Sequence, residues 1–328
     1  NFNETNNIRI SVLTGFRNPG VKEQFINKDL GTARLLGGLQ QIFEPYEIAS
    51  NSIFLQNVNQ FNEAVKTDMS EGTPIGLNQA INRNMQLLAP GIVSENQLQQ
   101  LKPERVVSYE IGYKTRVGNV LFFDAVYYYS NYSNFIGIAK VVKPRTSPQV
   151  NLFTAASQVN KSAQNDIYFL NINSQENVGI QGVALGGKWL MPMGSILSGN
   201  LTWSDLRNNS DDPVLPGFNT PGFKSNLTLQ NRRMDRMENN PGWRNIGFKV
   251  TWRYQSRYYW ESAFGDGWIE PVSTFDIQFS INVAKPKSMI KFGASNFFNN
   301  SFVYSFGGSK IGVLYYASYF IDGLFSKK

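Results

Sequence analysis

The sequence contains no cysteine and no histidine among its 328 residues. The absence of cysteine excludes a disulfide framework, a cysteine nucleophile and a thiolate metal site. The absence of histidine removes Ser-His-Asp and Cys-His catalysis, histidine-ligated zinc and histidine as a general base. No convergent nucleophile pattern replaces them. We therefore expect no enzymatic activity, no cofactor and no metal site.

Charge and long apolar runs are also scarce. Charged residues make up 17% of the chain, which is low for a soluble domain, and the net charge is +7. Lysine and arginine are scattered and no nucleic-acid-binding motif is present, so no nucleic-acid partner is expected. No run of about 18 apolar residues predicts a transmembrane helix. A membrane-spanning β-strand needs only about 9–11 residues that are apolar at alternate positions.

Such alternation is present in many segments. Along residues 107–116, Val, Tyr, Ile, Tyr and Thr alternate with Ser, Glu, Gly, Lys and Arg. Residues 246–255 and 275–283 repeat the pattern, and a period of two is that of a strand with a different environment on each face. About ten strands are predicted, near 7–16, 105–116, 120–136, 167–190, 194–206, 222–233, 244–261, 273–284, 288–303 and 311–323.

The predicted connections alternate in length. Short ones lie at 117–119, 191–194 and 285–288, and the connection at 234–243 is intermediate. Long ones lie at about 18–102, 138–166, 207–221 and 262–272. Short turns at one end and long loops at the other are typical of outer-membrane barrels. Aromatic residues also gather near strand ends, as in the aromatic girdles of membrane proteins. An aromatic-rich soluble β-protein, with ordinary β-propensity, is the alternative.

A barrel interpretation places apolar faces against outer-membrane lipid and polar faces in a wet lumen. Backbone groups in hydrocarbon must all be paired, so the sheet must close on itself. Ten strands left open would expose two unpaired edges. We therefore expect these strands to continue a larger wall.

Several motifs, in order along the chain, carry a family resemblance. They are TGFRNP at 14–19, LKPERVVSYEIGYK at 101–114, NYSNFI at 131–136, and three C-terminal segments that begin at Tyr259, Ile290 and Ile311. This ordered set resembles TonB-dependent outer-membrane receptors, and most closely the carboxypeptidase-regulatory-like and SusC-like group. The likeness covers most of the chain outside residues 20–100.

The resemblance implies an all-β, antiparallel transmembrane β-barrel of roughly 22 strands plugged by a globular domain. Residues 1–328 would be the C-terminal portion of the barrel, about its last ten strands, with a long extracellular loop at about 18–102. The plug domain, the first strands and the TonB-contacting N-terminal part would lie outside this sequence. The implied location is the bacterial outer membrane with a periplasmic C-terminus. The implied function is energised uptake of a large nutrient such as an oligosaccharide, a peptide or a metal chelate.

Two groups of aromatic residues are candidate ligand contacts. The long loop holds Phe43, Tyr46, Phe54 and Phe61 among many amides, and it could be a lid, a docking surface for a surface lipoprotein, or a self-packed cap. The other group flanks a second outer loop and comprises Tyr258, Tyr259, Trp260 and Trp268. Exposed aromatic rings stack on sugars and apolar ligands, but membership of the outer aromatic girdle is the favoured explanation of these four residues.

Charged residues of the polar strand faces are predicted to line the lumen. They are Glu110, Lys114, Arg116, Lys249, Arg253, Arg257 and Asp276. They could bind the plug through charge-assisted hydrogen bonds or pair with one another. Asp211 and Asp212 could hold Ca²⁺ together with backbone carbonyls, but their spacing is not that of an EF-hand loop.

The substrate is not specified by the sequence. The alternative to a transporter is a non-transporting structural barrel in a larger outer-membrane assembly. Stable co-purifying partners without an uptake phenotype on deletion would favour that alternative.

Overall fold

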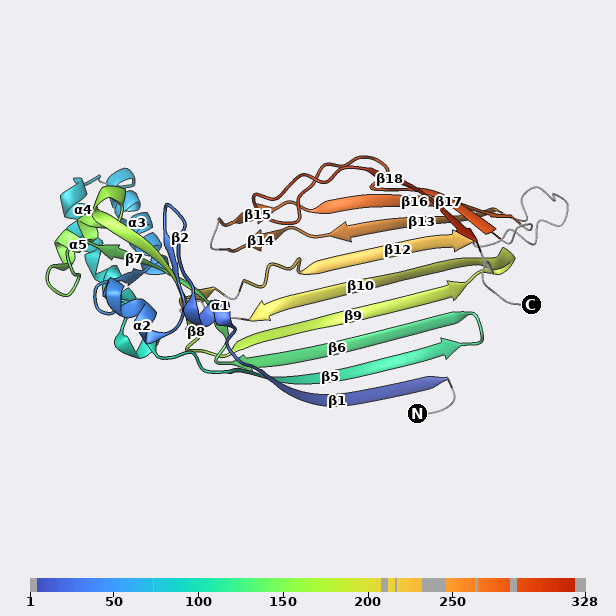
Figure 1. Cartoon of the computed structure of the whole chain (residues 1–328), viewed down its shortest axis with the longest axis horizontal. Helices are drawn as coiled ribbons and strands as arrows, with labels where there is room; N and C mark the ends of the chain where they lie inside the picture. Colours follow the sequence, from blue (N-terminus) through green and yellow to red (C-terminus); the bar gives the residue numbers. More distant parts are fainter. Residues whose placement is uncertain are drawn as a thin grey trace.

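The structure is a computed structural model that describes residues 5–72, 74–207, 212–215, 217–231, 246–262, 265–283 and 288–321. Its largest element is a ten-stranded antiparallel sheet in the order β1-β5-β6-β9-β10-β12-β13-β16-β17-β18 (Figure 1). The strands are β1 Asn6–Arg17, β5 Glu104–Val117, β6 Leu121–Ser133, β9 Val178–Leu190, β10 Ser195–Arg207, β12 Phe223–Asn231, β13 Ile246–Gln255, β16 Val272–Val283, β17 Ser288–Ser295 and β18 Leu314–Ile321. The predicted number of barrel strands is confirmed.

Short turns join these strands at one end of the sheet, here called the turn end. The β5–β6 hairpin closes with Val117 opposite Leu121, and Gly118 has a φ of 55°. This left-handed conformation is easily adopted by glycine, which has no Cβ. The β9–β10 turn contains the single helical turn η5 Pro192–Gly194. The predicted connections 234–243 and 285–287 lie outside the described residues.

The opposite end, here called the long-loop end, differs from the prediction. The predicted strand 167–190 is wrong because it is two strands, β8 Asn165–Asn173 and β9 Val178–Leu190, and β8 belongs to another sheet. The predicted loop 138–166 overlaps strand β7 Ile136–Pro144 and contains helix α5 Leu152–Gln158. The predicted strand 244–261 also breaks: β13 ends at Gln255, and β14 Tyr258–Trp260 pairs only with β15 Gly267–Ile269.

Three of the four long connections fold into one unit, which we call the loop domain, made of residues 20–101, 135–174 and 212–215. Its second sheet has the order β11-β7-β8-β3-β2, with β4 on β7, and the β3–β8 pair is parallel. Besides β7, β8 and α5, its elements are α1 Val21–Phe25, β2 Asn27–Asp29, β3 Arg34–Leu36, α2 Gln40–Phe43, η1 Glu44–Tyr46, β4 Ile53–Phe54, α3 Leu55–Ser70, α4 Leu77–Asn84, η2 Met85–Gly91, η3 Glu95–Leu98, η4 Ser162–Gln164 and β11 Val214–Leu215.

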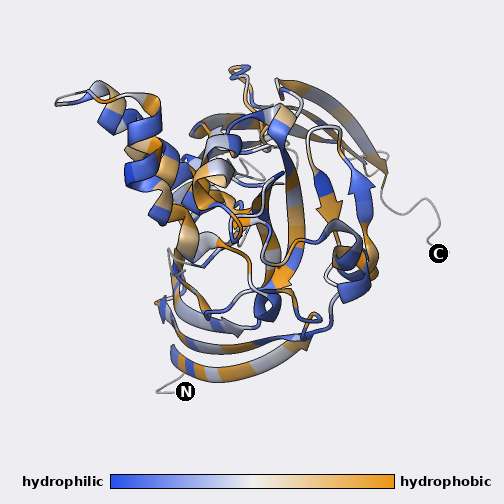
Figure 2. Ribbon diagram, turned by 90° about the vertical axis from the view of Figure 1, so that its left-hand side faces the viewer, coloured by the Kyte–Doolittle hydropathy of each residue, from blue (hydrophilic) through white to orange (hydrophobic). Residues whose placement is uncertain are grey.

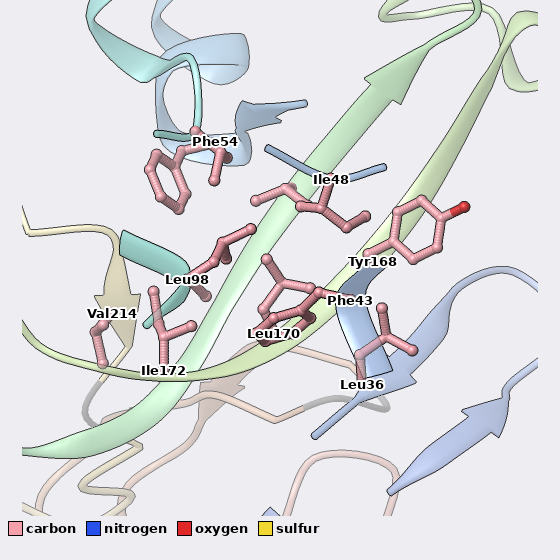
Figure 3. Packing of buried hydrophobic residues seen from close by; sticks show 12 residues of the cluster. Leu36, Phe43, Ile48, Phe54, Leu98, Tyr168, Leu170, Ile172 and Val214 are labelled. Carbon is pink, nitrogen blue, oxygen red and sulfur yellow. The ribbon is translucent and has the colours of Figure 1, made fainter. Parts of the chain in front are cut away.

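Both clusters of buried hydrophobic residues found in the described part of the chain lie in the loop domain. The first gathers around the second sheet and includes Leu36, Phe43, Leu170 and Ile172 (Figure 3). The second lies between α3, α4, η2 and α5 and comprises Ile53, Val58, Phe61, Val65, Ala80, Ile81, Leu88, Val142, Ala156 and Val159. The long loop is therefore a packed globular unit rather than an extended connection.

The large sheet is a curved wall, and the loop domain lies at its long-loop end (Figures 1 and 2). Seen end-on, the loop domain projects in front of the concave side of this wall (Figure 2). Among the described helices, none is both long enough and apolar enough to span a membrane.

Candidate functional site

The two faces of the large sheet differ in chemistry. Residues that pair across neighbouring strands point to the same side, so the register sorts the side chains by face. One such row crosses six strands as Ile10, Ile111, Tyr127, Val183, Trp203 and Phe223. Ile10 is 73% exposed and Ile111 is 49% exposed, although both are strongly apolar. Exposed apolar side chains repeated over a whole sheet are the outer surface of a membrane-embedded wall.

Charge is almost confined to the opposite, polar face. On the apolar face of the described sheet strands, the charged residues are Arg105, Asp205 and Arg207, all near the long-loop end. The polar face carries nine basic residues, namely Arg9, Arg17, Lys114, Arg116, Lys188, Lys224, Lys249, Arg253 and Lys291. It carries four acidic ones, namely Glu104, Glu110, Asp124 and Asp276. A charged side chain on a lipid-facing surface is costly, which explains this separation.

Six of the seven predicted lumen residues fall on this polar face. Glu110 forms an ion pair with Arg9, and the Arg253 Nε atom lies 2.7 Å from Asp276 Oδ2. Pairing among wall residues, one of the two expected roles, is therefore present for Glu110, Arg253 and Asp276. Lys114, Arg116 and Lys249 form no ion pair within the described part of the chain.

Arg257 is placed differently from the other predicted lumen residues. It lies beyond the end of β13, and its guanidinium sits 4.8 Å from the ring centre of Trp268. This cation–π contact assigns Arg257 to the β14–β15 hairpin rather than to the wall.

The predicted ligand contacts of the long loop are mostly interior. Phe43 is 3% exposed and belongs to the first core cluster (Figure 3), so the prediction of a surface contact at Phe43 is wrong in this conformation. Tyr46 packs on Tyr168 with ring centres 5.5 Å apart, and its hydroxyl donates to Asn27 Oδ1 at 3.2 Å. Phe43 is therefore a core residue, whereas Tyr46 is half-buried and packs against the edge of the first cluster.

The four residues of the second aromatic group all lie on the β14–β15 hairpin, but they differ in exposure. Tyr258 is buried and its hydroxyl donates to the Tyr304 carbonyl at 2.7 Å, so its predicted exposure is also wrong. Trp260 is half-buried. Tyr259 and Trp268 are paired across the hairpin, meet edge to face with ring centres 5.4 Å apart, and remain exposed. Of the four, these two are available for contact with a ligand or a partner.

A cluster of charges joins the loop domain to this hairpin. Lys140 of β7 forms an ion pair with Asp266, at the hairpin turn, and its ammonium lies 5.5 Å from the ring centre of Phe169. Glu261 lies beside this pair. Burial raises the pKa of the Glu261 carboxyl, and the nearby Asp266 carboxylate raises it further, whereas Lys140 lowers it. We call Lys140, Asp266 and Glu261 the rim cluster.

The hairpin that carries the rim cluster is itself held in place. A Cβ atom added at Gly267 would lie 2.2 Å from the Phe306 ring, so this ring packs directly on the glycine backbone. Asn219 exchanges two hydrogen bonds with the Glu261 backbone, at 2.8 and 2.9 Å. Sequence reasoning did not predict the rim cluster. The Asp266-Gly267 dipeptide, a common hairpin-turn signal, was the one local indication of the hairpin.

Asp212 has a structural role. It is buried, and its carboxylate accepts hydrogen bonds from the Ser174 hydroxyl at 2.5 Å, from Glu176 N at 3.0 Å and from Val214 N at 2.9 Å. These donors occupy the oxygens that a cation would need, so the calcium interpretation is not supported at Asp212. Asp211 lies outside the described residues. Within the described part of the chain, no group of three acidic side chains could hold a metal ion.

An antiparallel wall that is apolar outside and charged on its other face defines a transmembrane β-barrel protein. The family model described as "TonB dependent receptor-like, beta-barrel" matches residues 1–297. The chain therefore belongs to the TonB-dependent receptor family, whose barrels lie in the outer membrane. Its ten strands form part of such a barrel.

Solved structures with a similar fold include three proteins of this kind. The copper transporter OprC is 15% identical, with a TM-score of 0.47 over 67% of this chain and 31% of that chain. The siderophore receptor PirA from Acinetobacter baumannii is 15% identical, with a TM-score of 0.46 over 67% and 32%. The pyoverdine receptor FpvA from Pseudomonas aeruginosa is 12% identical, with a TM-score of 0.48 over 69% and 31%. The chain thus spans about a third of their length. No match was found among curated protein sequences.

Proposed function

We propose that this chain forms part of the wall of an energised outer-membrane transporter. In this role, its ten strands are the C-terminal portion of a barrel of roughly 22 strands that encloses a plug domain. An inner-membrane motor acts on that plug through TonB. One observation carries the proposal: 13 charged residues lie on the same face of the ten-stranded wall. The family model covers residues 1–297 of this chain.

In this proposal the long-loop end faces the cell exterior and the turn end faces the periplasm. Long loops on the outside and short turns inside are typical of such barrels. The loop domain is then a folded extracellular element at the mouth of the barrel. The cargo is a large nutrient, and the described aromatic pair Tyr259 and Trp268 is available to contact it.

The experiment combines a measurement of the mature protein's mass with a test of nutrient uptake by cells. The mature protein is purified from outer membranes, and its intact mass and N-terminal sequence are determined. A mass well above the 37.0 kDa of this chain, with plug sequence upstream, is expected. Deletion of the gene and deletion of TonB should then abolish growth on the same nutrient. A mature protein of this mass without a plug, or a nutrient whose uptake survives loss of TonB, would contradict the proposal.

A docking role for the loop domain is a second candidate. Its helical end exposes several large apolar side chains, namely Met69, Leu77, Leu87, Val150 and Phe153. Exposed apolar side chains on a folded surface favour contact with another protein, here a surface lipoprotein. Mild detergent extraction followed by affinity purification should recover such a lipoprotein with the parent protein. A variant with Leu77→Ser and Phe153→Ser should recover less of it.

A further inference from the structure

The polar face of the wall carries more basic than acidic residues, and three of its four acidic residues form ion pairs. Glu110 pairs with Arg9, and Asp276 pairs with Arg253. Glu104 pairs with Arg17, whose Nη2 atom lies 3.1 Å from Glu104 Oε2. The fourth acid, Asp124, lies directly opposite Lys114 in the β5–β6 register. The remaining basic side chains therefore have no carboxylate partner on the described wall.

Two of these unpaired lysines share a pocket near the turn end. The pocket has a volume of about 680 Å³, and its lining includes Lys249, Gln278, Ser280 and Lys291. None of the lining residues in the described part of the chain is acidic. Lys249 is paired with Gln278 and Lys291 with Ser280, so the two lysines flank β16 from the strands on either side. Neighbouring strands are about 4.8 Å apart, which lets two long lysine side chains reach one ligand.

Neutral hydrogen-bond donors complete this pocket. The Tyr316 hydroxyl donates to Gln278 Oε1 at 3.1 Å, which leaves the amide nitrogen of Gln278 free to donate. The ammonium of Lys291 lies 4.6 Å from the ring centre of Phe320, and this contact limits where the charge can move. Lysine ammoniums together with amide and hydroxyl donors bind oxyanions through charge-assisted hydrogen bonds.

We infer that the pocket between Lys249 and Lys291 binds oxyanionic groups: carboxylate, phosphate or sulfate. The inference deepens the proposed function and rests on it, because it takes the polar face to line the lumen. Such a group has two possible sources. It is either carried by the transported solute or presented as a carboxylate by the plug domain that fills the lumen.

The test uses the full-length protein purified in detergent at constant ionic strength. Citrate and inorganic phosphate are the anion probes, spermidine is the cation control, and binding is measured by titration calorimetry. The double variant Lys249→Gln with Lys291→Gln should bind citrate at least tenfold more weakly. Lys249→Arg with Lys291→Arg should retain binding. A matched control, Lys28→Gln with Lys161→Gln, removes the same charge from exposed positions of the loop domain and should change nothing.

A second arm distinguishes the two sources. The urea concentration that releases the plug is measured by its exposure to protease. If plug carboxylates fill the pocket, the parent binds no citrate and the double Gln variant releases its plug at lower urea than the control variant does. If the double Gln variant and the Lys28→Gln with Lys161→Gln control do not differ in citrate binding or in plug release, the inference is wrong. Should the double variant fail to assemble, each single Gln variant is expected to give at least a threefold change in the same measurement.

Failure of the proposed function would be visible separately. TonB-independent uptake in cells would refute energised transport and leave the binding result of the purified protein intact.

Discussion

The rim cluster should hold the loop domain and the β14–β15 hairpin together. The perturbation is Lys140→Met, which removes the ammonium but keeps most of the side-chain volume. It leaves the Asp266 carboxylate beside Glu261 without the cation that lies between the loop domain and the hairpin. Asp266→Asn and the double variant complete a thermodynamic cycle, and the cycle isolates the pairwise energy.

The expected coupling energy between Lys140 and Asp266 follows from how deeply their side chains are buried. The Lys140 side chain is 9% exposed and that of Asp266 is 27% exposed. Fully exposed ion pairs contribute about 0.2–1 kcal/mol, whereas loss of one partner of a fully buried pair costs about 3–5 kcal/mol. The rim pair is intermediate, so we expect a coupling energy of about 1–2 kcal/mol, which changes an opening equilibrium about 5- to 30-fold.

Hydrogen exchange detected by mass spectrometry is the assay. It reports the free energy of local opening for individual segments. Peptides from β7 and from the hairpin should lose protection together in Lys140→Met, while peptides from the centre of β5 and β6 should not change. Loss of protection in each single variant with no coupling in the cycle would refute the ion pair as the connection. The hairpin would then be held by its contacts with Phe306 and Tyr304 and by the hydrogen bonds of Asn219, without the ion pair.

Three further predictions test other parts of the structure. Phe61→Ala should destabilise the loop domain by about 3–5 kcal/mol, because Phe61 is 1% exposed in the second core cluster; its urea midpoint should fall while the sheet stays folded. Ile111→Lys places a charge on the apolar face and should cost about 2–4 kcal/mol of folding into lipid vesicles, whereas Ser108→Lys on the polar face should cost far less. The pKa of Glu261 is raised in the folded state, so its ionisation destabilises the folded hairpin as pH rises through that pKa. Glu261→Gln should therefore stabilise the β14–β15 hairpin at neutral pH and leave its stability unchanged below the unfolded-state pKa. A urea midpoint for Glu261→Gln that equals that of the parent at every pH would contradict this reasoning.

The wall was predictable because its signal is local. The alternation of apolar and polar residues along 107–116 assigns each side chain to a face, and the pairing of β5 with β1 and β6 follows that assignment. The same local signal failed along 167–190. Alternation shows that a segment is a strand but does not show which sheet it joins, so β8 and β9 were merged.

The loop domain and the rim cluster depend on contacts between distant segments. The β3–β8 pair joins Arg34 to Tyr168, and Lys140 meets Asp266. No periodicity within one segment encodes either contact. Phe43 illustrates the consequence. Its place in a polar loop predicts a surface contact, but residues of distant strands cover it.

The way in which the loop domain is divided along the chain has a consequence for inheritance. Its two main pieces, residues 20–101 and 135–174, are separated by the β5–β6 hairpin of the wall. Each piece supplies strands and core residues that the other lacks, so loss of either would expose the hydrophobic interior of its partner. A single recombination event that replaces one continuous segment therefore cannot exchange the loop domain without also replacing the β5–β6 hairpin. Lineages should gain, lose and remodel the two insertions together, even though a membrane-spanning hairpin lies between them.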